Sequence, residues 1–264
     1  MTGDPQRSER GSGSNRAPGA CHTASRMAFC MHTPPRTVLL LLALVLRPFP
    51  GFAQSTVVDR GTFLVTVDGR PAGSEAFVIR RAGTGAGTQV IATAEISLRG
   101  EGGRSELRPA LQMVGEDAQL AAYQMKASGA QDEEVFVTAG EERFLVRLRT
   151  SMGERESELR AAHGSLVLDN GVAHHHFFLP GRSLSEGDTL PIIVPREGNL
   201  TEVRVIGSEN AELQIGGQML PSRRIALAIG GATREVWLDA AGRVLRVTDT
   251  AAGYTALRTA PPDP

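Results

Sequence analysis

Apolar and polar residues alternate along most of the chain after residue 54. Across residues 90–98 every second residue is apolar, and Thr93, Glu95 and Ser97 lie between them. This period of two gives a β-strand one apolar and one polar face, as an antiparallel sheet with one wet side requires. The same alternation recurs in further runs, whose apolar positions are Phe63, Val65 and Val67; Leu107, Leu111 and Met113; Phe144, Val146 and Leu148; Ile225, Leu227 and Ile229; and Val236 and Leu238.

Short turn signals separate the alternating runs. They are rich in Gly, Asp and Ala, as in residues 67–73 (VDGRPAG) and 238–243 (LDAAGR), and they predict roughly a dozen strands. The strand pattern lapses at Val172–Leu179, the best candidate for a short helix. The sequence therefore predicts a mainly β protein. Its expected architecture is a large curved antiparallel meander sheet, half-barrel or barrel-like, with at most one or two short helices.

Residues 1–53 lack the strand pattern. Residues 1–30 are rich in Gly, Ser, Pro and Arg without an apolar period, so we expect them to be disordered. Residues 31–53 have the layout of a secretory signal peptide, with Arg36 before an apolar run at 38–46 and small residues at its end. That run is shorter than the about 20 residues of a transmembrane helix. We therefore expect no transmembrane segment in the mature chain.

The signal-peptide layout predicts where the mature protein begins. We expect translation to start at Met27 or Met31 and cleavage to occur near Ala53, because this gives a signal of ordinary length. The exported product would then be periplasmic or extracellular. Residues 54–256 are expected to form a single β domain, followed by a disordered tail at 257–264.

Charge and cysteine content narrow the possible functions of the mature chain. Six arginines and two acidic residues precede Gln54, which leaves 22 basic and 27 acidic residues and a net charge of −5. A mildly acidic chain lacks the excess of basic residues that binding to nucleic acid requires. Cys21 and Cys30 both precede the cleavage site, so we expect no disulfide, thiol nucleophile or thiolate metal site in the exported protein.

Three adjacent histidines, His174 to His176, raise the question of a metal site. Zinc needs three or four converging ligands, and Asp169 is the nearest carboxylate that could join His174 and His176. None of the histidines has the i, i+4 spacing of a helical two-histidine site. The simpler interpretation is a loop in which one imidazole packs beside Phe177 or Phe178 and the others are in water.

Motifs of common enzymes are missing from the sequence. It contains no G-x-S-x-G, no H-E-x-x-H and no S-x-x-K with a companion motif. We therefore expect a non-enzymatic protein without a cofactor. A metal-dependent enzyme centred on the His174–His176 cluster remains the catalytic alternative.

Several aromatic and sulfur-containing side chains are candidates for contact with an apolar ligand. Tyr123 and Met125 project to the same side of their strand, and core filling is their alternative role. Trp237 alternates with Val236 and Leu238 and so lies on the opposite face, where it could stack on a partner or cover the sheet. The candidate ligand-binding set is Tyr123, Met125, Phe177, Phe178 and Trp237.

Three segments in order carry a resemblance to a known group of proteins. They are residues 61–79 (GTFLVTVDGRPAGSEAFVI), 166–180 (LVLDNGVAHHHFFLP) and 236–247 (VWLDAAGRVLRV). The arrangement resembles bacterial secreted β-domains of unknown function that are similar in layout to periplasmic lipoprotein carriers. The resemblance implies a strongly curved sheet whose concave side receives an acyl chain or a short plug helix. It implies no catalytic activity.

The functional expectation follows from the apolar face of the sheet, which needs cover. We expect an exported envelope protein that binds a lipid or another apolar ligand, or an envelope protein, on its curved sheet. The alternative is a structural or interaction module whose sheet closes over its own core and holds no ligand.

Overall fold

The computed structural model describes residues 55–263, except for 101, 130–131 and 180–183. The expected disordered segment at 1–30 and the signal peptide at 31–53 lie outside the described residues. Pro50–Pro264 forms one compact unit. In the described ranges, no helix is long and apolar enough to cross a membrane.

Fifteen strands in the described part of the chain form one sheet. Two short 3₁₀ helices accompany them, η1 (Gly85–Gly87) and η2 (His174–Phe178). In chain order the strands are β1 (Thr56–Val67), β2 (Arg70–Ala82), β3 (Gln89–Gly100), β4 (Gly103–Val114), β5 (Gln119–Gly129), β6 (Glu133–Ala139), β7 (Arg143–Thr150), β8 (Gly153–Arg160), β9 (Leu166–Val167), β10 (Thr189–Val194), β11 (Asn199–Ile215), β12 (Gln218–Ile229), β13 (Ala232–Leu238), β14 (Val244–Asp249) and β15 (Tyr254–Arg258).

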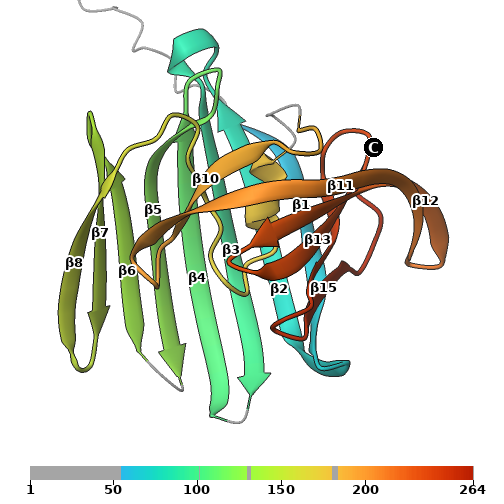
Figure 1. The fold of residues 1–264 in the computed structure, drawn as a ribbon. Coiled ribbons are helices and arrows are strands. Elements are labelled where there is room, and N and C mark those ends of the chain that lie inside the picture. Colours follow the sequence, from blue (N-terminus) through green and yellow to red (C-terminus); the bar gives the residue numbers. More distant parts are fainter. Residues whose placement is uncertain (1–54, 101, 130–131, 180–183, 264) are drawn as a thin grey trace, which may run out of the picture. The chain divides into compact units, whose positions relative to one another are not determined.

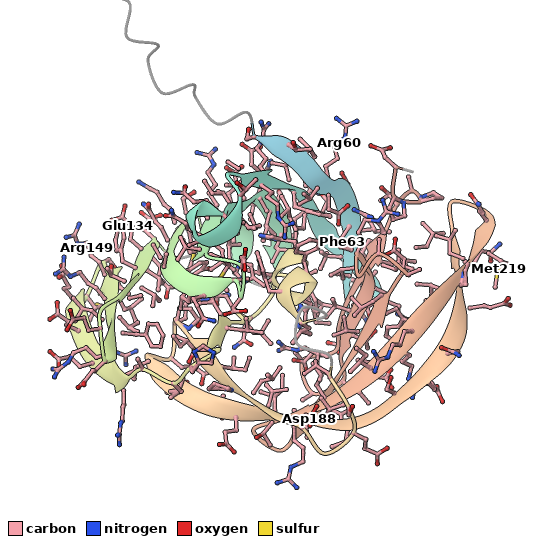
Figure 2. The ribbon with its side chains drawn as sticks, turned by 90° about the horizontal axis from the view of Figure 1, so that it is seen from above. Arg60, Phe63, Glu134, Arg149, Asp188 and Met219 are labelled. Atoms are coloured by element: carbon pink, nitrogen blue, oxygen red, sulfur yellow. The ribbon has the colours of Figure 1, made fainter. Side chains whose placement is uncertain are left out.

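Two meanders make up the sheet and meet at its middle. Across the sheet the neighbouring strands follow the order β8 to β1 and then β15 to β9. The first and last strands of the chain, β1 and β15, therefore pair. Every ladder is antiparallel except that between β9 and β10. The sheet curves around η2, as Figure 1 and the view from above in Figure 2 show. The predicted fold class is therefore confirmed, and η2 lies within the predicted helix at Val172–Leu179.

The alternation predicted from the sequence corresponds to the two faces of the sheet. Val90, Ala92, Ala94 and Ile96 of β3 are buried, whereas Glu95 between them is exposed. The buried face belongs to one large apolar core on the concave side. Each fully buried aliphatic side chain contributes about 1.5–3 kcal/mol of transfer free energy, so this core is the main stabilising term.

The hairpin between β1 and β2 shows how turn residues set the register. Asp68 and Gly69 both have positive φ, 49° and 73°, as a two-residue type I′ turn requires. Gly73 follows in β2, where a Cβ atom would lie 1.9 Å from the carbonyl oxygen of Ser97. Only glycine permits this close approach of β2 to β3.

The sheet has two free edges, β8 and β9, and no ladder joins them. Arg155 of β8 donates to the carbonyl oxygens of Arg196 and Glu197, both at 3.2 Å, in the turn between β10 and β11. Side-chain contacts thus bridge the opening. The strand β8 is rich in charged residues, which discourages pairing with another sheet.

A second, smaller core lies on the outer face. Trp237 packs there with Ile215 and Leu245, whereas its neighbours Val236 and Leu238 belong to the concave core. The predicted opposite orientation of Trp237 is therefore confirmed. Residues of the long β11–β12 hairpin, Ala211, Leu213, Ile215 and Leu220, pack in the same cluster as the indole.

The end of the domain differs from the expected boundary. Leu257 and Arg258, expected in a disordered tail, belong to β15 and pair with β1. Arg258 is only 2% exposed and donates to Asp59 at 2.6 Å. Further on, the Asp263 carboxylate pairs with Arg60 at 3.1 Å. The expectation failed because charged residues near a terminus resemble a tail unless their buried partner is known.

Candidate functional site

The histidine segment, residues 168–179, crosses the concave side of the sheet. His174, His175 and His176 are 0%, 0% and 1% exposed. The expectation that most of these imidazoles would be in water is therefore wrong. The segment is drawn inward because apolar residues flank the histidines on both sides, and these are Leu168, Val172, Ala173, Phe178 and Leu179.

Glu75 of β2 anchors the histidine segment to the sheet. Its carboxylate accepts the backbone N–H groups of Ala173 and His174, each at 2.8 Å, and lies 2.7 Å from His174 Nδ1. Glu75 is fully buried, and hydrogen bonds to a carboxylate are stronger than neutral ones. It therefore holds the start of η2 through three contacts from a strand about a hundred residues earlier in the chain.

The sequence carries a signal for Glu75 that the prediction missed. Phe77 and Ile79 show that the odd-numbered positions of β2 face the core. Glu75 stands in this apolar row, so a charged residue occupies a core position. A buried charge needs a partner, and this mismatch could have identified Glu75 as a site residue.

Aromatic rings continue from Glu75 into the core. The ring of His174 stacks on Phe77 at 5.8 Å, and Phe77 stacks on Phe63 at 5.1 Å. His174 also meets His175 edge-on at 4.6 Å. These contacts fix the imidazole of His174 in one orientation.

A second buried contact joins the histidine segment to β5. The Tyr123 hydroxyl donates to Asp169 at 2.6 Å, and Arg196 Nε donates to the other carboxylate oxygen at 2.8 Å. Burial and the adjacent Asp169 charge raise the pKa of Tyr123 well above its ordinary value. Tyr123 therefore remains a neutral donor that holds Asp169 in place.

The five candidate ligand-binding residues do not form one site. Tyr123 is engaged with Asp169, and Met125 is a fully buried core residue. Phe178 is also in the core, and Phe177 packs against it edge-on at 5.5 Å. Trp237 lies on the outer face, and the guanidinium carbon of Arg246 is 4.7 Å from the centroid of its ring. These side chains act in packing.

The three proposed metal ligands are likewise held by different partners. His174 faces Glu75, His176 Nδ1 faces the Ala173 carbonyl at 2.9 Å, and Asp169 faces Tyr123 and Arg196. Within the described ranges, no three His, Cys, Asp or Glu side chains converge as a metal site. Here the structure does not assemble His174, His176 and Asp169 into a coordination sphere.

His175 and His176 are neutral at ordinary pH. Burial lowers the pKa of His176 to about 3, with a further contribution from the Arg234 charge. Burial and the neighbouring His174 lower the pKa of His175 well below its usual range. A neutral imidazole has one donor and one acceptor nitrogen, so the contacts of each ring determine its tautomer.

The contacts assign opposite tautomers to these two histidines. The Ala173 carbonyl can only accept, so His176 carries its proton on Nδ1 and leaves Nε2 as an acceptor. His175 Nδ1 accepts from the Asp169 N–H at 3.4 Å, so its proton is on Nε2.

A cavity of about 690 Å³, here the His176 cavity, lies beside the histidine segment. Its wall combines the start of that segment with the turns that follow β10, β12 and β14. Both apolar and charged side chains line it. The polar ones are Asp169, Asn170, His176, Glu197, Asn199, Thr201, Arg234, Asp249 and Tyr254.

The charged side chains that line the His176 cavity have hydrogen-bond partners. Arg234 donates to Asp249 at 2.7 Å and to the side-chain oxygen of Asn170 at 3.3 Å. Glu197 accepts from the side-chain amides of Asn170 and Asn199, at 3.3 and 3.1 Å. These pairs fix the lining before any ligand enters.

Two lining residues each carry an unpaired polar atom. His176 Nε2 and the Tyr254 hydroxyl are buried and have no hydrogen-bond partner among the residues that the structure describes. A buried polar atom left unpaired costs about 1–3 kcal/mol. Such atoms at a cavity call for a functional explanation, and they make the His176 cavity the candidate binding site.

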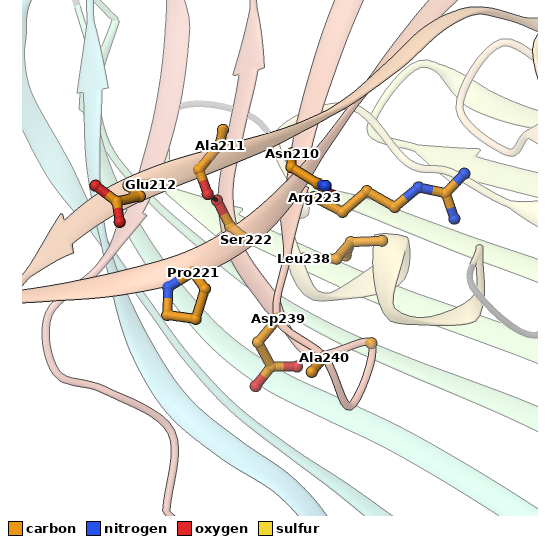
Figure 3. A pocket seen from close by; sticks show the side chains of 10 residues that line it. Asn210, Ala211, Glu212, Pro221, Ser222, Arg223, Leu238, Asp239 and Ala240 are labelled. Atoms are coloured by element: carbon orange, nitrogen blue, oxygen red, sulfur yellow. Dashed lines mark hydrogen bonds between the residues drawn. The ribbon is translucent and has the colours of Figure 1, made fainter.

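A second hollow, of about 800 Å³, lies between β11, β12 and the turn after β13 (Figure 3). Three of its polar side chains have partners within the surrounding hairpins. Ser222 donates to the Ala211 carbonyl at 3.0 Å, Arg223 donates to Ser208 at 2.7 Å, and Asp239 accepts three hydrogen bonds within its own turn. This hollow is larger, but its contacts serve the hairpins around it.

Comparison with known proteins adds one structural likeness. No family model matches the chain, and no curated protein sequence is significantly similar to it. The chain is similar to a solved β-barrel-like protein from Brucella abortus, described as a domain of unknown function, DUF1849. The likeness has a TM-score of 0.44 and 11% identity, and it covers 78% of this chain and 96% of the other.

Proposed function

We propose that this chain is an exported, non-enzymatic binding protein of the bacterial envelope that holds a small ligand in the His176 cavity. The observation that carries the proposal is the pair of unpaired polar atoms, His176 Nε2 and the Tyr254 hydroxyl, at the wall of that cavity. The charged side chains around them are held by hydrogen bonds, which reduces the side-chain ordering that binding requires. Export is supported by the signal-peptide layout of residues 31–53.

The lining favours a different ligand from the apolar one that the sequence suggested. An acyl chain would need the apolar concave face, and the histidine segment with β9 and β10 already packs on that face. The remaining space is lined by carboxylates, amides and a guanidinium as well as aliphatic groups. A ligand with polar groups fits this lining better than a lipid does.

A second candidate, a module without any ligand, is supported by the same filled core. In that case the His176 cavity would contain only water, and the two atoms, which are closed to solvent, would stay unpaired. A metal-dependent enzyme has no such support, because His174, His176 and Asp169 each have other partners.

Native mass spectrometry with a blocked cavity tests the proposal. Ala251 is an exposed turn residue in the cavity lining, so Ala251→Trp fills the entrance without disturbing the core. Ala241, an exposed residue in the turn after β13, supplies the matched control Ala241→Trp.

Each protein would be incubated with a small-molecule extract of the envelope fraction and desalted without detergent. We expect a bound small molecule on the wild type and on Ala241→Trp, and none on Ala251→Trp. A wild-type spectrum without any bound mass would support the ligand-free module and overturn the proposal.

A further inference from the structure

We infer that the ligand of the His176 cavity is a small molecule that presents hydroxyl or amino hydrogen-bond donors, and that it is not an anion. The inference rests on the proposed function and specifies its ligand. It follows from the hydrogen-bonding direction of the groups in the lining, taken one at a time.

The first group is His176. Its Nδ1 lies 2.9 Å from the Ala173 carbonyl oxygen, which can only accept. The ring proton is therefore on Nδ1, and the unpaired Nε2 presents a lone pair. Only a donor can satisfy this atom. An oxyanion would meet it with a second lone pair.

The carboxylates of the lining point to the same chemistry. Asp169, Glu197 and Asp249 line the cavity, against Arg234 as its cationic side chain. Two nitrogens of Arg234 are directed at Asp249, and Arg196 binds Asp169, so the charges in these two pairs offset each other. Among the described residues, Glu197 is the lining carboxylate without a cationic partner. An anion entering the cavity would be repelled by Glu197, and this repulsion is strong where water is excluded. A ligand that presents hydrogen-bond donors would instead find the carboxylate oxygens as acceptors.

Tyr254 is the group that can adapt. Its hydroxyl is unpaired, and burial together with the charge of Glu75 raises its pKa well above the ordinary value. It therefore stays protonated, and it can both donate to and accept from a ligand hydroxyl. The atom is closed to solvent, as is His176 Nε2, so a ligand group reaches them by inserting past the lining.

Hydroxyl and ammonium groups share this donor chemistry, and a thermal-shift experiment with three sets of probes distinguishes them. The first set is glucose, galactose and N-acetylglucosamine; the second is 1,4-diaminobutane and spermidine; the third is sulfate and acetate, which carry no donor near neutral pH. We expect a donor set to raise the Tm of the wild type by about 2–4 °C at saturating concentration and the anion set to leave it unchanged. A shift from the amine set should shrink as salt is added, and one from the sugar set should persist.

Two variants locate the effect. Tyr254→Phe removes the unpaired hydroxyl and is expected to fold normally, with a clearly smaller ligand-induced shift. Ala251→Trp is expected to abolish the shift, while Ala241→Trp keeps it.

Stabilisation by the anion set, or by neither donor set, would overturn the inference about the ligand class. A donor-induced shift that persists in Ala251→Trp would also overturn it, because the donor would then bind elsewhere. A bound mass in the native spectra would still support the proposed function in each of these cases, so the two failures are distinguishable.

Discussion

Glu75 illustrates, at the scale of single residues, how a buried charge organises this protein. It satisfies two backbone N–H groups and one imidazole at the start of η2. The alternation in β2 could have shown that Glu75 faces the core. It could not have shown which groups it meets, because Ala173 and His174 lie about a hundred residues away and no local pattern records a long-range contact.

Replacing Glu75 by glutamine tests this role. Glu75→Gln keeps the shape but loses the charge and turns one acceptor into a donor that faces an N–H group. We expect a loss of about 2–4 kcal/mol in the free energy of unfolding, measured by urea titration. Glu95→Gln, on the exposed face of neighbouring β3, is the matched control and should change stability by less than about 0.5 kcal/mol. An equal effect of both variants would contradict the anchoring role.

The two buried tyrosines give a second prediction at this scale. Tyr123→Phe leaves an Asp169 oxygen without its donor and should cost about 1–3 kcal/mol. Tyr254→Phe removes a buried hydroxyl that has no partner in the described part of the chain, so stability in the absence of ligand should not fall and should rise by up to about 1–3 kcal/mol. Urea unfolding of both variants measures the contrast. A loss of stability for Tyr254→Phe would show that its hydroxyl is engaged after all.

Among the elements, the strands could be predicted from the sequence, but the burial of the histidine segment could not. Period-two alternation in runs such as residues 90–98 is produced by the sheet itself, so the sequence reports it directly. The position of η2 was also predictable, because the strand pattern lapses there. Its burial was not, because polar histidines become core residues only when Glu75 and the Ala173 carbonyl satisfy them.

Burial of this element makes stability depend on pH. His175 and His176 have lowered pKa values in the folded state, whereas the unfolded chain takes up protons near pH 6.5. Their contribution is complete above about pH 6.5 and is lost as the pH falls. Each histidine contributes a slope of about 1.4 kcal/mol per pH unit.

Urea unfolding between pH 7.5 and 5 measures this slope above the main carboxylate range. Arg234 and Asp249 face His176, and the lowered pKa of Asp249 acts in the same direction at more acidic pH. The raised pKa values of Asp59 and Glu133 have the opposite effect on stability, which they lower as the pH rises through the acidic range. His176→Asn should reduce the slope, and the exposed control His163→Asn should leave it unchanged. A stability independent of pH over this range would contradict the burial of neutral histidines.

In the whole molecule, the order of the sheet depends on pairing between its two ends. The meanders β1–β8 and β10–β15 follow from local hairpins, but the β1–β15 ladder that joins them is a long-range contact. The sequence therefore predicted one curved sheet without its order. For the same reason the expected tail at 257–264 began inside β15.

Truncation tests this closure. Ending the chain after Ala256 removes Arg258 and leaves Asp59 as a buried, unpaired carboxylate, at a cost of about 3–5 kcal/mol. Ending it after Thr259 removes only exposed contacts such as Arg60–Asp263 and should cost about 1 kcal/mol or less. Thermal unfolding of the two truncated proteins measures the difference. Equal stability would mean that the last strand does not hold the two meanders together.

Occupancy of the His176 cavity is the claim on which the functional account depends, and a crystal structure of the protein purified from its native host cells tests it most directly. We expect density for a small molecule between the histidine segment and the turn after β14, with a donor group within hydrogen-bond distance of His176 Nε2 or the Tyr254 hydroxyl. A cavity that holds only water, or that the protein's own side chains fill, would contradict the account.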